Sequence, residues 1–564
     1  MNDPTAPQGQ PDPHSGFTES AEAWQRAYDA QAGPERPRVN ASGIELLPLY
    51  GPEQWDGTRH VADLGYPGQA PYTRGIHASM HRGRPWSPRM VVGFGVPQDY
   101  NQRMRSLYAL GLTGLFVSPC NSHLRGYDPD EVDRELLGTC GTLISTTDDM
   151  AQCLDGLPFD QESVSLGDTA PYTLTAMLLK VARQRSVPWD RLAGTTNQSD
   201  YLSHFAALHM FYRLALPGQK RIGLDHFDWM NQQVPRWNPL SVVGQHMQQA
   251  GATPAQAMGL TICSALQYAS DLRERGRDPD VFLRRFSFFF DISINFFEEV
   301  AKFRAARRLW ARLAAERFGA RDPRALKFRF HAQTSGADLT RQQPLNNIAR
   351  VAVQAMAGIF GGLQSLHTDS FDEALGIPTE ATARVAVATQ NILRDEAGLA
   401  DVIDPLGGSY YVETLTDQME HEILEVIRAV DDQGGMFAAV QTGFVQRLIG
   451  ASALAFQKRV DAGERIVVGV NAYQQPGADD RPPTLERPDP QKIDQYLAAL
   501  RDFRARRSAV AVERALDALV RSFDDPKVNA YGFVVAALDA GATHGEVCAR
   551  TREAVGFGEP LVVV

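Results

Sequence analysis

Eight short runs of apolar or β-branched residues, separated by stretches of helical period, constrain the fold of this chain more than any other feature. The helical spacing is clearest at 254–273 and 295–318. Eight strands that alternate with helices predict an α/β fold of the (β/α)8, or TIM, barrel type. The eight runs lie at residues 90–95, 114–118, 163–166, 191–196, 240–244, 286–291, 327–331 and 361–366.

Polar side chains stand at or just after the ends of these runs. The clearest cases are Phe-His-Ala-Gln-Thr-Ser-Gly at 330–336 and Gly-Gly-Leu-Gln-Ser-Leu-His-Thr at 361–368, where an apolar approach ends in an imidazole, an amide and hydroxyls. In a barrel of this kind the site is built at the carboxyl ends of the strands. The residues expected to face it are Ser118, Gln198, His246, His331, Gln333, Gln364 and His367.

The rest of the chain suggests three regions. Residues 1–60 begin with a Pro- and Gly-rich stretch of weak periodicity and are expected to form an N-terminal arm. Residues 61–400 hold the barrel. Residues 401–564 are expected to form a helical region, with a helix over 417–428, a Pro-rich break at 475–490 and a helical tail over 491–554.

Composition narrows the class of protein. The chain has 564 residues, 43% of them hydrophobic, and a net charge of −11 without a long Lys or Arg run, which argues against nucleic-acid binding. Five cysteines without a Cys-x-x-Cys pair predict neither a zinc site nor a disulfide framework. The N-terminus lacks a signal layout, and no apolar run reaches the ~20 residues of a membrane span. We expect a cytoplasmic enzyme that does not bind membranes.

Seven blocks, in order along the chain, carry a family resemblance. They are Tyr-Thr-Arg-Gly at 72–75, Gly-Arg-Pro-Trp at 83–86, Arg-Gly-Tyr-Asp at 125–128, Gly-Gln-His-Met-Gln-Gln-Ala-Gly-Ala-Thr at 244–253, Asn-Phe-Phe at 295–297, Asp-Pro-Leu-Gly-Gly-Ser-Tyr-Tyr-Val-Glu at 404–413 and Gly-Val-Asn-Ala-Tyr at 469–473. With these blocks the chain resembles the large subunit of adenosylcobalamin-dependent acyl-CoA mutases, the methylmalonyl-CoA mutase family. Its layout is most like the split isobutyryl-CoA and 2-hydroxyisobutyryl-CoA mutases.

The resemblance implies a barrel enzyme that rearranges the carbon skeleton of an acyl-CoA by radical chemistry. It implies adenosylcobalamin as the cofactor, which supplies the reactivity while the protein binds, orients and excludes water. The cobalt-ligand motif Asp-x-His-x-x-Gly is missing from the printed sequence. We therefore expect a separate small cobalamin-binding subunit and a heterotetramer.

The resemblance also implies roles for single residues. His246 and Gln198 are the expected catalytic contacts to the thioester carbonyl, although a one-residue gap leaves Asn197 as an alternative to Gln198. His331 is expected on the substrate side, and Gln333, Gln364 and Glu373 on the adenosyl side; for Glu373 a solvated helix carboxylate is the competing interpretation. The expected contacts to the CoA tail are Arg84, Arg89, Asn238, Arg285 and Ser287.

Departures from the family pattern predict the substrate. Val91 stands where methylmalonyl-CoA mutases place a tyrosine, and Leu208, or Ala207 if the gap moves, stands where they place the arginine that binds the free carboxylate. An unpartnered buried carboxylate is costly, so the acyl group should be branched and uncharged. Gln245 and Asn121 add polarity, which favours a substituted acyl chain, and the Ser118 hydroxyl could bond a substrate hydroxyl. Thioesters of the 2-hydroxyisobutyryl, isobutyryl and pivalyl type all stay open.

Two other classes of function compete with this interpretation. The altered positions would also suit a catalytically degenerate scaffold or regulatory subunit, against which the retained His246 and Gln198 speak. A metal-dependent CoA lyase would need clustered carboxylate or histidine ligands at the strand ends, and Asp291 with His331 does not make such a cluster. A carboxylate substrate would in turn require another cation, for which Arg213 and Arg221 are the candidates.

Overall fold

The computed structural model describes residues 25–26, 38–50, 54–55, 57–208, 214–474 and 486–558. The chain divides into two compact units, Met1–Leu49 and Tyr50–Val564. In the first unit, β1 (Arg38–Val39) and β2 (Glu45–Leu46) form an antiparallel hairpin, and most of the predicted arm lies outside the described residues. The predicted division of the chain at residues 60 and 400 stays a prediction.

The second unit is built on parallel strands in two sheets. One sheet has the order β3-β11-β10-β9-β8 and the other the order β4-β5-β6-β7. The strands are β3 (Ser87–Arg89), β4 (Gly114–Val117), β5 (Ser163–Gly167), β6 (Gly194–Asn197), β7 (Trp237–Asn238), β8 (Leu240–Val243), β9 (Phe286–Ile292), β10 (Phe330–Thr334) and β11 (Ser365–His367).

The two sheets join at both edges. A parallel bridge between Val92 and Val117 links the residues after β3 to β4, and the Ser118 N–H donates to the Val92 carbonyl at 3.2 Å. At the other edge β7 pairs with β6, and the chain passes through Pro239 directly into β8, which pairs with β9. With β7 and β8 counted as one interrupted strand, the predicted (β/α)8 barrel is confirmed.

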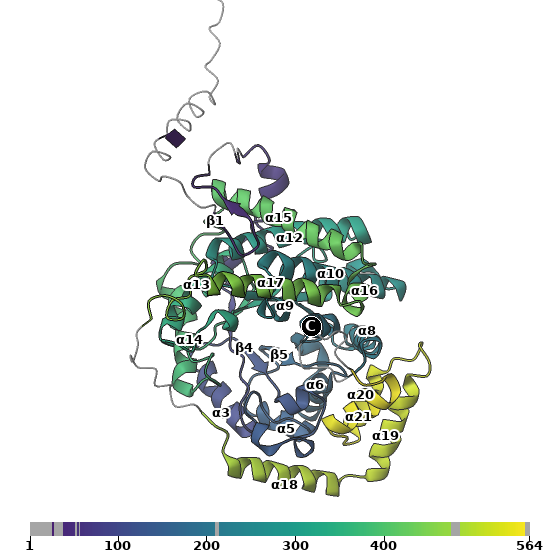
Figure 1. Cartoon of the computed structure of the whole chain (residues 1–564). Helices are drawn as coiled ribbons and strands as arrows, with labels where there is room; N and C mark the ends of the chain where they lie inside the picture. Colours follow the sequence, from purple (N-terminus) through teal and green to yellow (C-terminus); the bar gives the residue numbers. More distant parts are fainter. Residues whose placement is uncertain are drawn as a thin grey trace, which may run out of the picture. The chain divides into compact units, whose positions relative to one another are not determined.

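Helices connect these strands and continue beyond them. The α-helices are α2 (Met80–Gly83), α3 (Pro97–Tyr108), α4 (Asn121–Leu124), α5 (Thr147–Cys153), α6 (Thr173–Gln184), α7 (Tyr201–Ala206), α8 (Leu216–Gln233), α9 (Gln245–Gln249), α10 (Pro254–Glu274), α11 (Pro279–Phe282), α12 (Phe296–Phe318), α13 (Asn346–Phe360), α14 (Glu380–Asn391), α15 (Tyr410–Asp431), α16 (Met436–Gln441), α17 (Phe444–Asp461), α18 (Pro490–Arg506), α19 (Ala509–Ser522), α20 (Tyr531–Asp539) and α21 (His544–Val555). Figure 1 shows α3, α5 and α6 outside β4 and β5, with α18–α21, in yellow, further out.

Four predicted strands are shifted in the structure, among them β11, which begins at Ser365 rather than at 361. The first strand is β3 rather than residues 90–95. The sequence pattern did not predict β3 because Pro88, which has no N–H to donate, is uncommon within strands. Residues 189–191 form a 3-10 turn, so β6 starts at Gly194. The seventh strand is β10, which lies three residues beyond the predicted 327–331 and therefore contains both His331 and Gln333.

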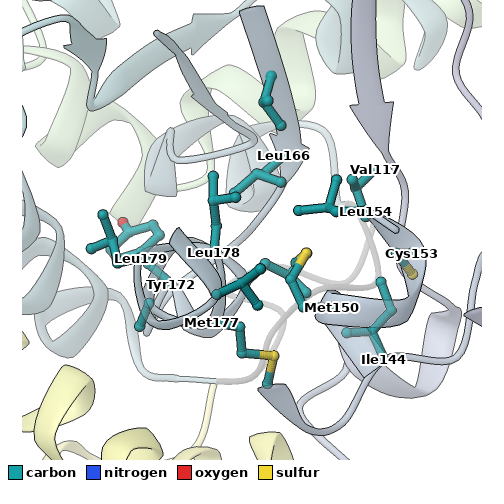
Figure 2. Close-up of a cluster of buried hydrophobic side chains, with 14 of the residues drawn as sticks. Val117, Ile144, Met150, Cys153, Leu154, Leu166, Tyr172, Met177, Leu178 and Leu179 are labelled. Carbon is teal, nitrogen blue, oxygen red and sulfur yellow. The ribbon is translucent and has the colours of Figure 1, made fainter. Parts of the chain in front are cut away.

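A dry core packs the barrel wall against its helices. Val117 of β4 and Leu166 of β5 meet Met150 of α5 and Leu178 of α6, all at most 1% exposed (Figure 2). Helix α6 is buried on nearly every side, and α20 packs against it. A helix without a polar face is stable only when it is covered in this way.

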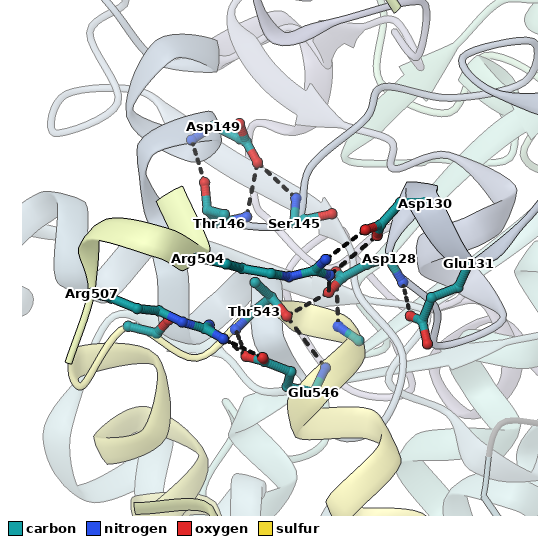
Figure 3. Close-up of polar contacts among 12 residues, drawn as sticks. Asp128, Asp130, Glu131, Ser145, Thr146, Asp149, Arg504, Arg507, Thr543 and Glu546 are labelled. Carbon is teal, nitrogen blue, oxygen red and sulfur yellow. Dashed lines mark hydrogen bonds and ion pairs between the residues drawn. The ribbon is translucent and has the colours of Figure 1, made fainter. Parts of the chain in front are cut away.

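The buried carboxylate of Asp128 is one of the anchors of the C-terminal helices. It accepts hydrogen bonds from the Arg504 guanidinium at 2.8 Å and the Gly545 N–H at 3.0 Å, and also from the Thr543 hydroxyl (Figure 3). Arg504 reaches Asp130 as well, at 2.6 Å. The block Arg-Gly-Tyr-Asp at 125–128 therefore anchors the tail rather than forming part of a site.

A second polar network joins two other matched blocks to α12. The Arg304 side chain, fully buried, pairs with both Asp404 and Glu413, and Arg74 donates to Asp404 at 2.9 Å. The neighbouring Arg307 donates to the carbonyls of Tyr72, Thr73 and Gly361, and its burial beside Arg304 lowers its pKa to about 9. We refer to Arg74, Arg304, Asp404 and Glu413 as the α12 network.

Candidate active site at the carboxyl ends of the barrel strands

A cavity of about 650 Å³ lies at the carboxyl ends of the strands. Its wall comes from the loops and first turns after β3, β4, β6, β8, β10 and β11, as expected for a barrel enzyme. The predicted site residues that line it are Val91, Ser118, Gln198, Gln245, His246, Gln333 and Glu373, together with His367. The structure thus brings together residues from 91 to 373 in the sequence.

Gln198 follows β6 in a strained conformation. Its φ of +70° is in the left-handed region, which non-glycine residues rarely adopt and which often marks functional sites. The side-chain amide oxygen Oδ1 of the adjacent Asn197 accepts from the Gln198 N–H at 2.9 Å, which ties the Asn197 side chain to the turn. Gln198 lines the cavity, and its side-chain oxygen is buried with no hydrogen-bond partner within the described ranges. Of the two residues left open by the sequence, Gln198 is the one in the cavity wall.

His246 reaches the cavity from the tight turn between β8 and α9. A Cβ on Gly244 would lie 2.4 Å from the Thr261 hydroxyl and 2.6 Å from the Phe290 ring, so only glycine allows this turn. The His246 ring is 6% exposed, and its Nδ1 lies 3.4 Å from the Ser203 hydroxyl. The packing of the turn therefore fixes the direction in which the imidazole points.

His331 lies deeper, inside the barrel. Its Nδ1 lies 2.8 Å from the Ser365 hydroxyl, and its ring is 5.1 Å from that of Phe289, which lines the cavity. Burial, with Arg89 and His367 nearby, lowers its pKa well below the usual value, so the imidazole is neutral at pH 7. Its Nε2 has no hydrogen-bond partner in the part of the chain that the structure describes. A buried polar atom in this state is suited to a ligand.

Carboxyl groups line one side of the cavity. His367 accepts from the Val91 N–H at Nδ1 (3.2 Å), so its Nε2 carries the proton and donates to Asp369 at 2.9 Å. Glu373 is exposed at the cavity, but the partial loss of solvation there, with Asp369 and Asp372 close by, raises its pKa to about 8. Its carboxyl group can therefore donate a hydrogen bond at neutral pH. Asp369 was missed from the sequence, although His-Thr-Asp at 367–369 ends a strand.

The remaining predicted contacts lie toward the amino ends of the strands. Arg89, nearly fully buried, donates to the carbonyls of Leu115 and Ser163, both at 3.2 Å, and burial lowers its pKa to about 10. Gln364 accepts from the Phe330 N–H at 2.8 Å. At the same end of the barrel, the Ser287 hydroxyl donates to the Leu240 carbonyl. The Asn238 amide donates to the Thr195 hydroxyl, and the Arg285 guanidinium donates to the Asn231 side chain. Arg84 is exposed. None of these described residues belongs to the cavity wall.

Hydroxyl side chains line the barrel between the two ends. Strand alternation and register place Ser163, Thr195, Ser287 and Ser365 on the inner face, and each keeps part of its surface exposed. Most barrels of this type fill that space with Val, Ile and Leu. The small polar residues leave room for an extended, amide-containing chain along the axis.

Cations are scarce in the cavity wall. Arg103 is the one Arg or Lys among the described lining residues, and it is already paired with Glu486 at 2.7 Å and the Pro378 carbonyl at 2.9 Å. Leu208 is 37% exposed and lies outside the cavity wall. Arg221 donates to Asp225 and to carbonyls of the C-terminal region. Arg213 lies outside the described residues.

Neither a metal cluster nor a membrane-spanning helix is found in the described part of the chain. No group of three or more His, Cys, Asp or Glu side chains there could hold a metal ion. No helix there is both long enough and apolar enough to span a bilayer.

A parallel barrel with a polar cavity at its strand ends defines an α/β-barrel enzyme. Residues 39–557 match the family model described as methylmalonyl-CoA mutase, and the chain belongs to that family. Members of the family are cobalamin-dependent isomerases, and the chain falls in this enzyme class.

Three relatives illustrate the range of the family. The 2-hydroxyisobutanoyl-CoA mutase large subunit of Aquincola tertiaricarbonis is 36% identical over 499 residues, 87% of each chain. The probable mitochondrial methylmalonyl-CoA mutase of Caenorhabditis elegans is 38% identical over 90% of this chain and 68% of its own length. The methylmalonyl-CoA mutase of Rhizobium meliloti (strain 1021) is 38% identical over 91% of this chain and 72% of its own.

Proposed function

We propose that the chain is the large subunit of an adenosylcobalamin-dependent mutase that rearranges a branched, non-dicarboxylic acyl-CoA. Substrates of the 2-hydroxyisobutyryl-, isobutyryl- or pivalyl-CoA type fit this proposal. The observation that carries it is the lack of a free cation among the described residues of the cavity wall. Val91 is aliphatic, and Arg103, the one arginine among these lining residues, is already paired with Glu486. A substrate carboxylate would be desolvated there without a partner of its own.

His246 and the Gln198 amide are the proposed contacts to the thioester carbonyl. Both line the cavity, and both are directed by tight backbone turns rather than by flexible loops. Donors held in place before the reaction stabilise charge that develops on an oxygen without having to reorganise. Ser118 and Gln245 would then face the acyl group, where a hydroxyl substituent could bond to them.

The cavity also suits the adenosyl part of the cofactor. When bound, adenosylcobalamin supplies the radical that removes and returns a substrate hydrogen. Gln333 and the protonated Glu373 can hold the adenosyl group, because each presents a polar side chain to the cavity. Gln364 was expected here too, but its amide bonds to the backbone of Phe330 and Gly362. The proposed adenosyl contacts are therefore Gln333 and Glu373.

The CoA tail would enter from the other end. Arg84, Arg89, Asn238, Arg285 and Ser287 lie toward the amino ends of the strands, and the hydroxyl-lined interior separates them from the cavity. An extended pantetheine arm along the axis would place the thioester near His246 and the nucleotide near exposed Arg84. Arg89 would then act on the arm inside the barrel rather than on phosphates, since its guanidinium is buried.

A separate cobalamin-binding small subunit is the proposed partner. The printed name "large subunit" of the Aquincola relative, which matches over 87% of its length, supports this layout. Exposed apolar side chains lie in two neighbouring segments, one of them in the connection after β10: Leu345 before α13 is 67% exposed and Tyr473 is 77% exposed. Gln343 joins their two segments through the Tyr473 carbonyl at 3.2 Å. We propose that this Leu345–Tyr473 patch contacts the small subunit.

The test is an assay of the chain with adenosylcobalamin and a small cobalamin-binding subunit from a related split mutase. Isobutyryl-, pivalyl- and 2-hydroxyisobutyryl-CoA are compared with methylmalonyl-CoA at equal concentration. We expect turnover of at least one neutral thioester and little turnover of methylmalonyl-CoA. Comparable activity on methylmalonyl-CoA would contradict the proposed substrate class, and activity of the chain without a small subunit would contradict the proposed partner.

A further inference from the structure

Two cysteines meet beside the cavity, although they lie in different parts of the β4–α5 connection. Residues 118–120 and 140–142 run side by side: the Cys120 N–H donates to the Thr142 carbonyl at 2.8 Å and the Thr142 N–H to the Ser118 carbonyl at 2.9 Å. A Cβ on Gly141 would lie 2.1 Å from the Pro119 carbonyl oxygen. Glycine is therefore required for this close approach, which brings Cys140 against Cys120.

The two thiols differ in exposure and interact directly. Cys120 is 1% exposed, and its sulfur accepts the Gly138 N–H at 3.3 Å. Cys140 is exposed and lines the cavity. Its nearby thiol is the largest cause that lowers the pKa of Cys120 to about 6, against the effect of burial, and the same pairing raises the pKa of Cys140. The pair therefore gives up one proton more readily than isolated thiols do.

The other cysteines lack this arrangement. Cys153 and Cys263 are buried, and burial raises the pKa of each thiol. Cys548 is also buried, packed against His544. Thiols of this kind react slowly because the thiolate is the reactive form and the reagent cannot reach it.

We propose that Cys120 and Cys140 form a reversible dithiol–disulfide pair, oxidised by small peroxides that enter through the cavity and reduced by small dithiols. In the first step Cys140 passes its proton to the Cys120 thiolate as its sulfur attacks a peroxide oxygen; the O–O bond breaks, Cys140 becomes a sulfenic acid, and the released hydroxide takes up a proton to give one water. In the second step the Cys120 sulfur attacks the Cys140 sulfur and releases a second water. Overall, two thiols and one hydrogen peroxide give one disulfide and two waters.

The surrounding backbone suits this exchange. The hydrogen bonds between 118–120 and 140–142 hold the two segments side by side, which favours closure of a disulfide between them. Exposed Cys140 meets the oxidant and buried Cys120 resolves the sulfenic acid, the usual division of labour in redox-sensing pairs. Because Ser118 and Cys140 both line the cavity, the bond would alter the cavity wall beside the acyl group.

The test uses the full chain treated with an equal amount of hydrogen peroxide, followed by blocking of thiols and peptide mapping without reduction. We expect one cross-linked peptide pair, Cys120–Cys140, and a fall from five reactive thiols to three after denaturation. Dithiothreitol should restore all five. Turnover is not needed as a readout, so this result is independent of the proposed function.

Matched variants make the outcome decisive. Cys140→Ser keeps an exposed polar side chain and should abolish the cross-link, whereas Cys263→Ala should leave it unchanged. Thermal unfolding of each variant checks that the fold is retained. Absence of the Cys120–Cys140 peptide at peroxide levels that consume Cys140, or equal cross-linking of Cys153, Cys263 or Cys548, would overturn the proposal.

Discussion

The α12 network and the cavity wall are both rich in buried polar residues, but they differ in whether these residues have partners within the protein. In the α12 network each charge faces an opposite charge: Arg304 meets Asp404 and Glu413, although its Nε has no hydrogen-bond partner among the described residues. In the cavity region, Gln198 Oε1 and His331 Nε2 are buried without a partner among the described residues. Satisfied polar groups stabilise a fold, whereas unsatisfied ones are expected where a ligand completes them.

This difference sorts the matched sequence blocks by role. Tyr-Thr-Arg-Gly at 72–75 and Asp-Pro-Leu-Gly-Gly at 404–408 resemble the family as closely as Gly-Gln-His-Met-Gln at 244–248 does. The first two end in the α12 network or its neighbour Arg307, and the third ends in the cavity. Loss of the first kind should reduce stability and loss of the second kind should reduce turnover.

The largest effect is expected for Arg304→Met. Removal of the guanidinium leaves Asp404 and Glu413 buried without their central partner, which costs about 3–5 kcal/mol of unfolding free energy. Denaturant unfolding measures this loss. Arg312→Met is the matched control, since that arginine is 42% exposed and its pairing with Glu420 should contribute no more than about 1 kcal/mol. Equal losses of unfolding free energy in the two variants would show that the buried ion pairs of the α12 network contribute no more to stability than an exposed pair.

His246→Ala should show the reverse pattern. We expect turnover to fall by about a hundredfold, the effect of deleting one preorganised donor to a reacting oxygen, with little change in unfolding free energy. Steady-state kinetics with the small subunit measure the first quantity and thermal unfolding the second. His77→Ala, at an exposed histidine outside the cavity wall, is the control. Unchanged turnover in His246→Ala would exclude His246 from the mechanism.

Tyr473→Ala should affect assembly alone. A large exposed aromatic side chain at a subunit interface commonly contributes more than about 1 kcal/mol to binding, so affinity for the small subunit should fall by about tenfold. Titration calorimetry or sedimentation measures it. Val510→Ala, at a 71% exposed position on α19, should leave affinity unchanged. If Tyr473→Ala also binds normally, the Leu345–Tyr473 patch is not the interface.

The smallest effect is a change in pH dependence. Glu373 is protonated below its pKa of about 8 and loses the proton it can donate above that pH, so turnover should decline on the alkaline side. Because this pKa is raised on folding, the group's favourable share of stability is lost as pH rises through about 8. Glu373→Gln, which stays neutral, should flatten the alkaline limb. If the alkaline decline in turnover persists unchanged in Glu373→Gln, a different titrating group causes it.

The strand–helix alternation was sufficient to predict the barrel, because strand period and helix period differ over every unit. Strand ends were less predictable. Pro88 and the 3-10 turn at 189–191 changed where pairing begins, and only the partner strand decides that register. The three-residue shift of β10 relative to the predicted strand placed His331 in the barrel interior.

Site membership was predictable where a residue directly follows a strand, as with Ser118, Gln198 and His246. It was not predictable for Arg103 on α3 or Asp369, whose positions depend on how distant segments pack. Leu208 shows the limit of alignment: it stands near a family arginine in sequence, yet the structure places it outside the cavity wall. Charge pairing, such as that of Arg103 with Glu486, is a tertiary property.

Asp128 also sets an order of events during synthesis. Its hydrogen-bond partner Gly545 lies 417 residues further along the chain, so the ribosome makes that partner long after the barrel strands β4 and β5. Earlier parts of a chain fold first, and contacts of such separation form late. The β4–α5 connection, with its two cysteines, must therefore wait with a solvated carboxylate until the last helices emerge. The connection that supplies Ser118 and Cys140 to the cavity wall is thus anchored by the final tenth of the chain.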